Sequence, residues 1–428
     1  MQGVYRVFLQ RLWRDRAGNA LVIAAACMPL LIGAAGLAVD TTNWTYWKRQ
    51  LQREADSAAL AGAFAKLQGM DVAAAATSDL ARTNVITLSA PASIQNAPIT
   101  GSFAGDPLAV RVALSTQKRL PFSGSFMSSV PIISAHATAK VLQFGDYCLG
   151  ATGSGSAIGI TMMGSATLDF NCSLYTNSTN QAKAVIAGGS ALLNATSITA
   201  SGGISGNNYS NTTQLSPYSP PQPDPFASVP SQTPSGSCTA VNVPPNQTKA
   251  VPNPTGITCI KNVNLSGTVT FSPGTYVVDG GSFDIGSKAN VSIDASVPAP
   301  NGDTGVTFIL TSSTGASDIA YLNINAGATI NLTASTKGTY AGILFYQDRN
   351  AQDIKTNTIN GNASTFFQGA FYFPSQEIKF NGTSGVTWKC MQLVGLRFTF
   401  SGSTKITNEC PAGSGASSWH GVQVKLVE

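Results

Sequence analysis

The sequence predicts an α+β chain that is mostly β, with a membrane-spanning helix near its N-terminus. Three observations predict this class. An uncharged apolar run extends over residues 17–39, and a spanning helix needs roughly 20 such residues. A helical pattern of small residues continues beyond this run. From residue 146 onward, short alternating strands are separated by Gly, Asn, Asp or Ser.

Residues 1–16 form a basic lead, and we interpret residues 17–39 as the transmembrane helix. Because positive residues stay on the cytoplasmic side, the N-terminus is predicted to be cytoplasmic and the rest external. Two alternatives stay open: a buried helix of a soluble protein, and a cleaved secretory signal with a weak site at Gly33-Ala34-Ala35-Gly36. The basic residues of the lead, which face only Asp15, are Arg6, Arg11, Arg14 and Arg16.

Composition argues against a nucleic-acid partner. Charged residues make up 11% of the chain, whereas soluble domains have about 25%. Much of the net charge of +5 comes from the basic lead, which is better explained by membrane topology than by phosphate binding.

Three aromatic residues follow the apolar run directly, namely Trp44, Tyr46 and Trp47. Aromatic side chains concentrate at membrane–water interfaces, where an apolar ring and a polar edge are both accommodated. We interpret them as membrane-interface residues, and a ligand-stacking platform is the alternative.

Residues 40–145 are predicted to form a stalk helix packed on a small antiparallel sheet. Leu51, Ala55, Gly62 and Ala65 recur at helical spacing. Two strand-like runs, 108–114 and 132–141, follow and would form the sheet.

Residues 146–428 are predicted to form a large right-handed parallel β-helix-like domain. The strands are short and repetitive, and no helical pattern intervenes, as expected for stacked coils. A β-sandwich has the same strand content and is the alternative. Prolines interrupt the pattern in residues 215–254, which we interpret as a strap, with a flexible linker as the other reading.

Seven cysteines are present, of which Cys27 lies in the apolar run. The other six fall on the predicted external side, where disulfides persist. We favour local pairs whose members are about 20 residues apart, although six cysteines permit many connectivities. A zinc site is disfavoured because no Cys-x-x-Cys occurs and both histidines stand alone. The favoured pairs are Cys148–Cys172, Cys238–Cys259 and Cys390–Cys410.

No catalytic, cofactor-binding or metal-ligating residues are predicted. Acid–base catalysis needs carboxylates at controlled separation, and the aspartates after residue 146 are scattered. Asp348-Arg349 with Asp353 is the tightest charged group, and we interpret it as a solvated turn. A polysaccharide lyase or hydrolase on a β-helix is the enzymatic alternative.

Several N-terminal strings resemble those of the Tad/Flp pilus-assembly TadG-like family. They are Arg16-Ala-Gly-Asn19, Met28-Pro29-Leu30, Gly36-Leu-Ala-Val-Asp40 and Leu51-Gln-Arg-Glu-Ala-Asp-Ser-Ala-Ala-Leu-Ala61. The later strings Phe271–Gly281, Gly342–Arg349 and Gly369–Pro374 are similar to the β-rich regions of such proteins. The resemblance implies a pilin-like arrangement for residues 40–145.

Two departures from related proteins matter. Pilin-like relatives cleaved by prepilin peptidase carry Glu five residues after the Gly, whereas Ile23 follows Gly18 at that offset. The resemblance therefore implies an uncleaved anchor. Some TadG-like proteins also carry a von Willebrand A metal site, but Asp294-Ala-Ser-Val-Pro298 lacks its second Ser, so we expect no such site.

The resemblance implies a non-enzymatic component of a Tad/Flp-type pilus assembly or secretion apparatus in the bacterial inner membrane. Its single span would leave the N-terminus cytoplasmic and a β-rich head periplasmic. Expected partners are the membrane and other Tad components: pilins, minor pilins and platform proteins. The alternative is an adhesin or carbohydrate-binding head displayed at the pilus or cell surface, with a glycan as partner.

Overall fold

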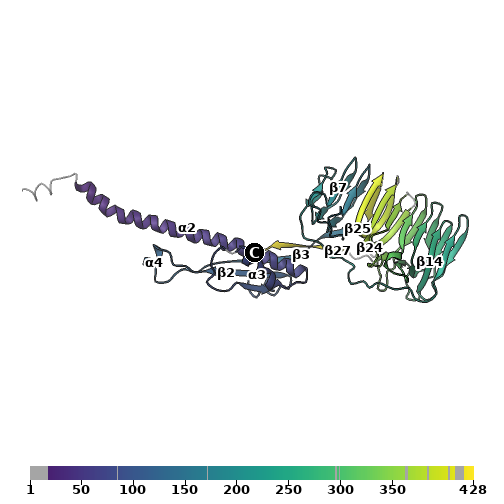
Figure 1. Cartoon of the computed structure of the whole chain (residues 1–428), viewed down its shortest axis with the longest axis horizontal. Helices are drawn as coiled ribbons and strands as arrows, with labels where there is room; N and C mark the ends of the chain where they lie inside the picture. The colour runs from purple at the N-terminus through teal and green to yellow at the C-terminus, as the bar shows by residue number, and fades with distance from the viewer. Residues whose placement is uncertain are drawn as a thin grey trace, which may run out of the picture. The chain divides into compact units, whose positions relative to one another are not determined.

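The computed structural model describes residues 18–83, 85–170, 172–294, 296–297, 299–361, 365–382, 385–402, 405–409 and 419–428. The chain divides into two compact units (Figure 1). Unit 1 comprises Met1–Leu142 and Val422–Glu428, and unit 2 comprises Gln143–Gly421.

Unit 1 is organised by one helix, α2, which runs from Gly18 to Leu67 and contains Pro29 (Figure 1). Ala and Leu dominate its sequence, and both favour helix. From Val22 to Val39 nearly every side chain is exposed, whereas Leu51 and most of the alanines that follow it in α2 are buried. The long apolar helix at the N-terminus is thus confirmed, and its two halves have different surroundings.

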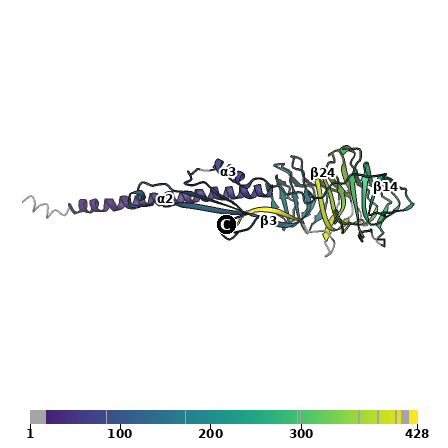
Figure 2. The same ribbon diagram turned by 90° about the horizontal axis from the view of Figure 1, so that it is seen from below.

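The buried half of α2 packs on a small sheet and a second helix, α3 (Val72–Thr83). Figures 1 and 2 both show α3 beside α2. The strand β2 (Ala109–Thr116) pairs antiparallel with β1 (Ser93–Asn96) and with the first half of β3 (Ile133–Ala151). A short helix, α4 (Ser123–Phe126), lies between β2 and β3. The shared core includes Ala55, Ala59, Val72, Ala76, Val110, Val112, Ala135 and Ala137.

The last residues of the chain also belong to unit 1. The strand β27 spans Trp419–Leu426, and Val424 joins the core of unit 1. The N–H of Thr138 donates to the carbonyl of Glu428 at 2.8 Å, and the N–H of Val427 donates to the carbonyl of Thr138 at 2.8 Å. The sequence-based boundary placed residues 422–428 in the β-rich domain. Their alternation of apolar and polar residues does not show which sheet the strand joins.

Unit 2 is a stack of short, parallel strands. Strands three apart in the chain pair with each other, so that β16 pairs with β19 and β19 with β22. Each coil of the chain therefore lies on the next. The strands are β4 (Ile160–Met162), β5 (Thr167–Asp169), β6 (Ser173–Thr176), β7 (Val185–Ala187), β8 (Leu192–Asn194), β9 (Ser197–Ala200), β10 (Ile204–Ser205), β11 (Gln214–Ser216), β12 (Thr239–Val243), β13 (Thr248–Val251), β14 (Ile257–Leu265), β15 (Thr268–Phe271), β16 (Gly274–Asp279), β17 (Ser282–Ile285), β18 (Asn290–Ile293), β19 (Val306–Thr311), β20 (Tyr321–Ile324), β21 (Thr329–Thr333), β22 (Ile343–Gln347), β23 (Thr356–Asn360), β24 (Thr365–Gly382), β25 (Gly385–Gly402) and β26 (Lys405–Glu409), with a 3₁₀ turn at Ala316–Asp318.

The order of the coils in space differs from their order in the chain. The first coil, formed by the end of β3 with β4 and β5, pairs with the last, formed by β25 and β26. In Figure 1 the yellow β25 accordingly lies between the coils around β7 and those around β24 and β14. After β11 the chain passes to β12, which pairs with β14 in the other set of coils. Unit 2 is therefore built as two sets of coils that meet at β25.

Aromatic side chains form a continuous column inside the stack. The ring centroids of Phe271 and Phe308 lie 5.0 Å apart, those of Phe308 and Phe345 lie 5.1 Å apart, and those of Phe345 and Phe371 lie 4.9 Å apart. All four side chains are fully buried. Because successive coils are in register, like residues stack on like residues. The mostly-β class is confirmed, and the right-handed β-helix assignment stays a prediction.

Candidate functional site

The first candidate functional region is the exposed, apolar half of α2. Among the described residues, one helix is long and apolar enough to cross a membrane, and 6% of its most apolar stretch is buried. Leu30 and Leu31 are 74% and 68% exposed. Such apolar exposure is costly in water and favourable in a bilayer, which indicates membrane anchoring.

The predicted membrane-interface residues lie on α2 directly after this half. Tyr46 is exposed, and Trp44 and Trp47 are half-buried. Tyr46 and Trp47 line a hollow of about 460 Å³, and residues 85–89 and 116–118 form the rest of its lining. Their role at a membrane interface stays a prediction.

The junction between the two halves of α2 is held by the segment around α4. The carboxylate of Asp40 is fully buried, and its Oδ2 accepts the N–H of Ser123 at 2.6 Å. One turn earlier, the ring of Phe122 lies so close to Gly36 that a Cβ there would come within 2.1 Å of it. The contact therefore requires glycine, because any larger residue would push the ring away from the helix.

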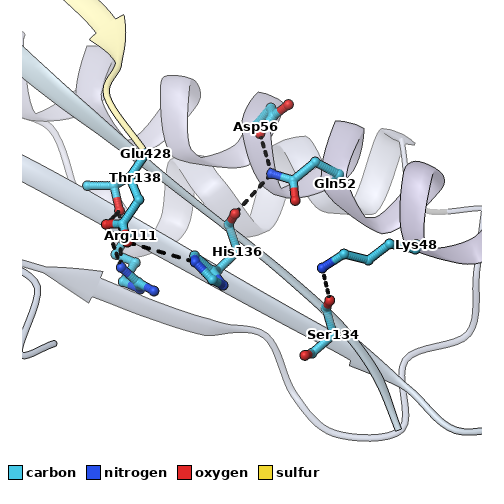
Figure 3. A network of polar contacts seen from close by, with 8 residues as sticks. All are labelled: Lys48, Gln52, Asp56, Arg111, Ser134, His136, Thr138 and Glu428. Carbon is cyan, nitrogen blue, oxygen red and sulfur yellow. Dashed lines mark hydrogen bonds and ion pairs between the residues drawn. The ribbon is translucent and has the colours of Figure 1, made fainter. Parts of the chain in front are cut away.

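Polar side chains of α2 next cover the edge of β3 (Figure 3). The ammonium group of Lys48 donates to the carbonyl of Ser134. One turn later, the amide Nε2 of Gln52 donates to the carbonyl of His136 at 2.9 Å and to Asp56 Oδ1 at 2.8 Å. An uncovered strand edge can pair with another chain, so these donors both attach the helix and protect the edge.

The same edge of β3 continues into a charged cluster (Figure 3). Arg111 and Glu428 form an ion pair at 2.7 Å, and the hydroxyl of Thr138 donates to the same carboxylate at 3.2 Å. Gly101, at φ +91°, packs against the pair, where a Cβ would lie 2.3 Å from Arg111 Nη1. The cluster thus joins β2, β3 and the final residues of the chain within unit 1.

A second buried carboxylate on α2 is Glu54, which is 2% exposed. Its Oε1 accepts the N–H of Val85 and the side-chain amide of Gln50, each at 3.0 Å. Asp40 and Glu54 therefore act alike, since each binds the backbone of a segment that crosses the helix. The sequence marked Asp40 only as the end of the uncharged run and placed Glu54 only on a polar face of the helix. A carboxylate among small apolar residues is the signal that could have indicated their buried contacts.

In unit 2, two of the favoured disulfides are present: Cys148–Cys172 and Cys238–Cys259. The third, Cys390–Cys410, falls outside the described side chains. Cys27 is a free, exposed cysteine on α2. The Cys238–Cys259 bond joins the end of the proline-rich segment to β14.

The predicted strap, residues 215–254, is too long, because residues 239–243 and 248–251 form β12 and β13 of the stack. The name strap is therefore kept for the proline-rich residues 217–238, which follow the outside of the stack. Asn177 exchanges hydrogen bonds with the backbone of Gln222 at 2.8 Å near its start. Phe226 and Val229 then pack with Tyr346 and other buried side chains of β19, β22, β24 and β25. The strap is therefore ordered by contacts with coils from both sets.

Arg349 supplies most of the polar contacts in the middle of the strap. Its guanidinium donates to the carbonyls of Phe226, Ala227 and Val229 at 3.0–3.1 Å, and to the hydroxyl of Tyr372. Burial opposes the charged form, but the Tyr372 contact and neighbouring negative charge raise the pKa of Arg349 above its ordinary value.

The interpretation of Asp348-Arg349 as a solvated turn is wrong. Asp348 is only 6% exposed and accepts hydrogen bonds from Ser231 and Thr311. The strap covers this turn, which local sequence does not reveal. Asp353 is exposed and pairs with Arg397 at 2.7 Å.

Unit 2 also contains a hollow of about 340 Å³, lined by Asp303, Lys337 and Tyr340 among others. Asp303 is desolvated, but hydrogen bonds from Ser335, Thr336 and Gly305 hold its pKa below the usual value. The carboxylate of Asp303 is therefore already hydrogen-bonded to the neighbouring turn. Within the described ranges, no group of three or more His, Cys, Asp or Glu residues is placed to hold a metal ion.

The adhesin alternative depends on exposed aromatic side chains along the stack. Among the unit 2 side chains that the structure describes, the exposed aromatic residue is Tyr218. A glycan partner therefore stays a prediction, and the described side chains do not form a surface of exposed aromatic rings that would support it.

Searches of curated proteins and of solved structures gave no match to the chain. One protein-family model, described as "Putative Flp pilus-assembly TadE/G-like", matches residues 18–77. The matched segment contains all of α2 and the first half of α3, and therefore includes the exposed apolar half of α2, Asp40 and Glu54. The family predicted from the N-terminal strings is thus the one whose model matches residues 18–77, here called the Tad-type segment.

Proposed function

We propose that this protein is a non-enzymatic component of a Tad/Flp-type pilus assembly or secretion apparatus, anchored in the bacterial inner membrane. In this proposal the N-terminus is cytoplasmic, and the stacked β head of unit 2 lies in the periplasm and makes assembly contacts. Pilins, minor pilins and platform proteins are the partners that the Tad-type segment suggests.

The observation that carries this proposal is the continuity of α2. One helix contains both the exposed apolar residues before Asp40 and the buried residues that form the core of unit 1. No linker therefore separates the apolar span from the part of the helix that packs through Leu51, Ala55 and Ala59. A continuous helix of this kind would hold unit 1 at a fixed distance from the membrane, which supports the proposed anchoring.

The fold of unit 2 supports a role in contacts with partner proteins more than a role in catalysis. The strap and the Cys238–Cys259 bond fasten the sides of the stack, and the stacked aromatic column fills its interior. A rigid surface of this kind lowers the entropic cost of binding a partner. The right-handed β-helix class is part of this proposal.

Topology can be tested by cysteine accessibility in intact cells. In a Cys27→Ser background, a cysteine at Ser102 should react with a membrane-impermeant maleimide once the outer membrane is opened. A cysteine at Gln2 should react only after lysis of the inner membrane. The reverse pattern would overturn the proposed orientation.

The pilus role can be tested by deleting the protein in its native host. We expect fewer assembled pili in sheared surface fractions, with recovery when the full chain is restored. Normal pilus amount and normal secretion in the deletion strain would overturn the proposal.

A further inference from the structure

The segment that joins β2 to β3 exposes an unusual set of apolar side chains. This segment, residues 118–132, is here called the α4 loop. Phe126 is 86% exposed, Ile132 67%, Met127 41% and Phe122 38%. Clustered apolar exposure of this kind marks a surface that contacts a partner or a membrane.

The α4 loop lies beside the end of the apolar half of α2. Phe122 packs on Gly36, and the N–H of Ser123 binds Asp40. Because a helix rises about 1.5 Å per residue, these two contacts lie within about 6 Å along the helix axis. They coincide with the point at which the uncharged run 17–39 ends, so the loop sits where α2 would leave the bilayer.

The charges of the loop fit the same surroundings. Lys118 and Arg119 precede its apolar residues and are exposed. The guanidinium of Arg119 donates to the carbonyl of Gly124, with Nε at 3.1 Å, which keeps this charge next to α4. Apolar side chains flanked by basic residues are typical of segments that insert at a membrane interface, where anionic headgroups attract the cations.

We propose that the α4 loop is a second membrane contact, which inserts Phe126 and Met127 into the leaflet from which α2 emerges. The occupant of this apolar surface is lipid, because the loop is continuous with the membrane-facing surface of α2. The proposal rests on the anchoring by α2. Two contacts beside each other would restrict the tilt of unit 1 on the membrane, which one helix alone does not.

The test uses the full chain in vesicles of phosphatidylethanolamine and phosphatidylglycerol. Nitroxide spin labels are placed at residue 126 or at Ser102 in a Cys27→Ser background, and at Cys27 itself in the unmodified chain. Collisions with oxygen, which concentrates in lipid, are compared with collisions with a water-soluble nickel complex. We expect a several-fold higher oxygen-to-nickel ratio at 126 than at the exposed Ser102, and the highest ratio at Cys27.

The outcomes separate this inference from the proposed function. A high ratio at Cys27 with a water-like ratio at 126 would overturn the loop contact and leave the anchor intact. A water-like ratio at Cys27 would instead refute the anchor. Low collision rates with both reagents at 126 would place the side chain against protein, and broadening that disappears on dilution with unlabelled chain would identify a second copy. Either result would overturn a lipid contact.

A matched pair of variants tests the role of the side chain itself. With the label at the neighbouring Ser125, Phe126→Leu should preserve the lipid-like ratio, because Leu also partitions into the interface. Phe126→Asp should lower the ratio toward that of Ser102. Phe126 is 86% exposed, so neither change removes a packing contact needed for folding. Equal ratios in the two variants would contradict the proposal.

Discussion

The carboxylate of Asp40 accepts the backbone N–H of Ser123 at 2.6 Å, across 83 residues of sequence. Its other oxygen, Oδ1, is buried with no hydrogen-bond partner among the described residues. Burying a carboxylate with one unsatisfied oxygen costs free energy. We therefore interpret the hydrogen bond that Asp40 accepts from Ser123 as the contact that positions the α4 loop. This residue both ends the apolar run of α2 and attaches the first segment that crosses the helix.

Replacing Asp40 should release the α4 loop from α2. Asp40→Ala removes the acceptor and leaves the Ser123 N–H buried without a partner, which costs about 1–3 kcal/mol. We expect faster hydrogen exchange at the Ser123 amide in the detergent-solubilised protein. Asp40→Asn is the matched control, because its side-chain oxygen can still accept the bond. Unchanged exchange in Asp40→Ala would show that Phe122 packing alone holds the loop.

Replacing Arg349 should free the middle of the strap. Arg349→Met keeps the length of the side chain but loses its hydrogen bonds to the strap carbonyls, and hydrogen bonds to charged groups contribute about 1.5–3 kcal/mol each. Proteolysis within residues 223–231 of the folded protein should therefore be faster in this variant than in the unmodified chain.

Arg397→Met is the matched control for that change. Arg397 pairs with the exposed Asp353, and surface pairs contribute less than about 1 kcal/mol. The strap should keep its resistance to protease in this variant. Equal cleavage in the two arginine variants would contradict the assigned role of Arg349.

Removing the Cys238–Cys259 disulfide should destabilise unit 2. The bond closes a loop with a sequence separation of 21, and a loop of this size corresponds to about 3 kcal/mol in the chain-entropy model. We expect the paired change Cys238→Ser and Cys259→Ser to lower the denaturant midpoint of unit 2. An unchanged midpoint would show that the strap contacts alone hold this end. The exposed Cys27→Ser is the control, and it should leave the midpoint unchanged.

Tyr340 should make unit 2 less stable in alkaline solution. Burial raises the pKa of its hydroxyl from 10.0 to about 12, and this hydroxyl donates to the carbonyl of Pro230 at 2.7 Å. Between about pH 10 and 12 the unfolded state loses this proton while the folded state retains it. The free energy of unfolding must therefore decrease as pH rises through this range.

The measurement is the denaturant midpoint between about pH 9 and 12. The midpoint of the unmodified chain should fall across this range. Tyr340→Phe should start from a lower value, because it lacks the hydrogen bond to Pro230, and should show a shallower fall, because it has no proton to lose. Parallel pH profiles would show that the ionisation of Tyr340 is not coupled to unfolding.

Much of unit 1 could be predicted because its signals are local. The uncharged run before Asp40 and the small residues around Ala55 mark one helix with two surroundings. The contacts of Asp40 and Glu54 could not be predicted, since their partners Ser123 and Val85 use backbone atoms that any residue supplies.

The two disulfides of unit 2 were predictable from proximity along the chain, because short loops bring their ends together at low entropic cost. The position of the strap was not. Its prolines show that it is extended, but the residue that holds it, Arg349, belongs to a turn that looks solvated in sequence.

The sequence by itself determined the apolar helix, the Tad-type segment and the mostly-β class of the remainder, and it favoured the two cysteine pairs that the structure contains. Only the tertiary structure decided that the first coil, at β4, lies against β25, and that residues 422–428 return to unit 1. The physical reason is that short parallel strands with the same alternation are interchangeable locally. Which of them pair depends on stacked side chains, such as Phe308 on Phe345, that meet only after the chain has folded.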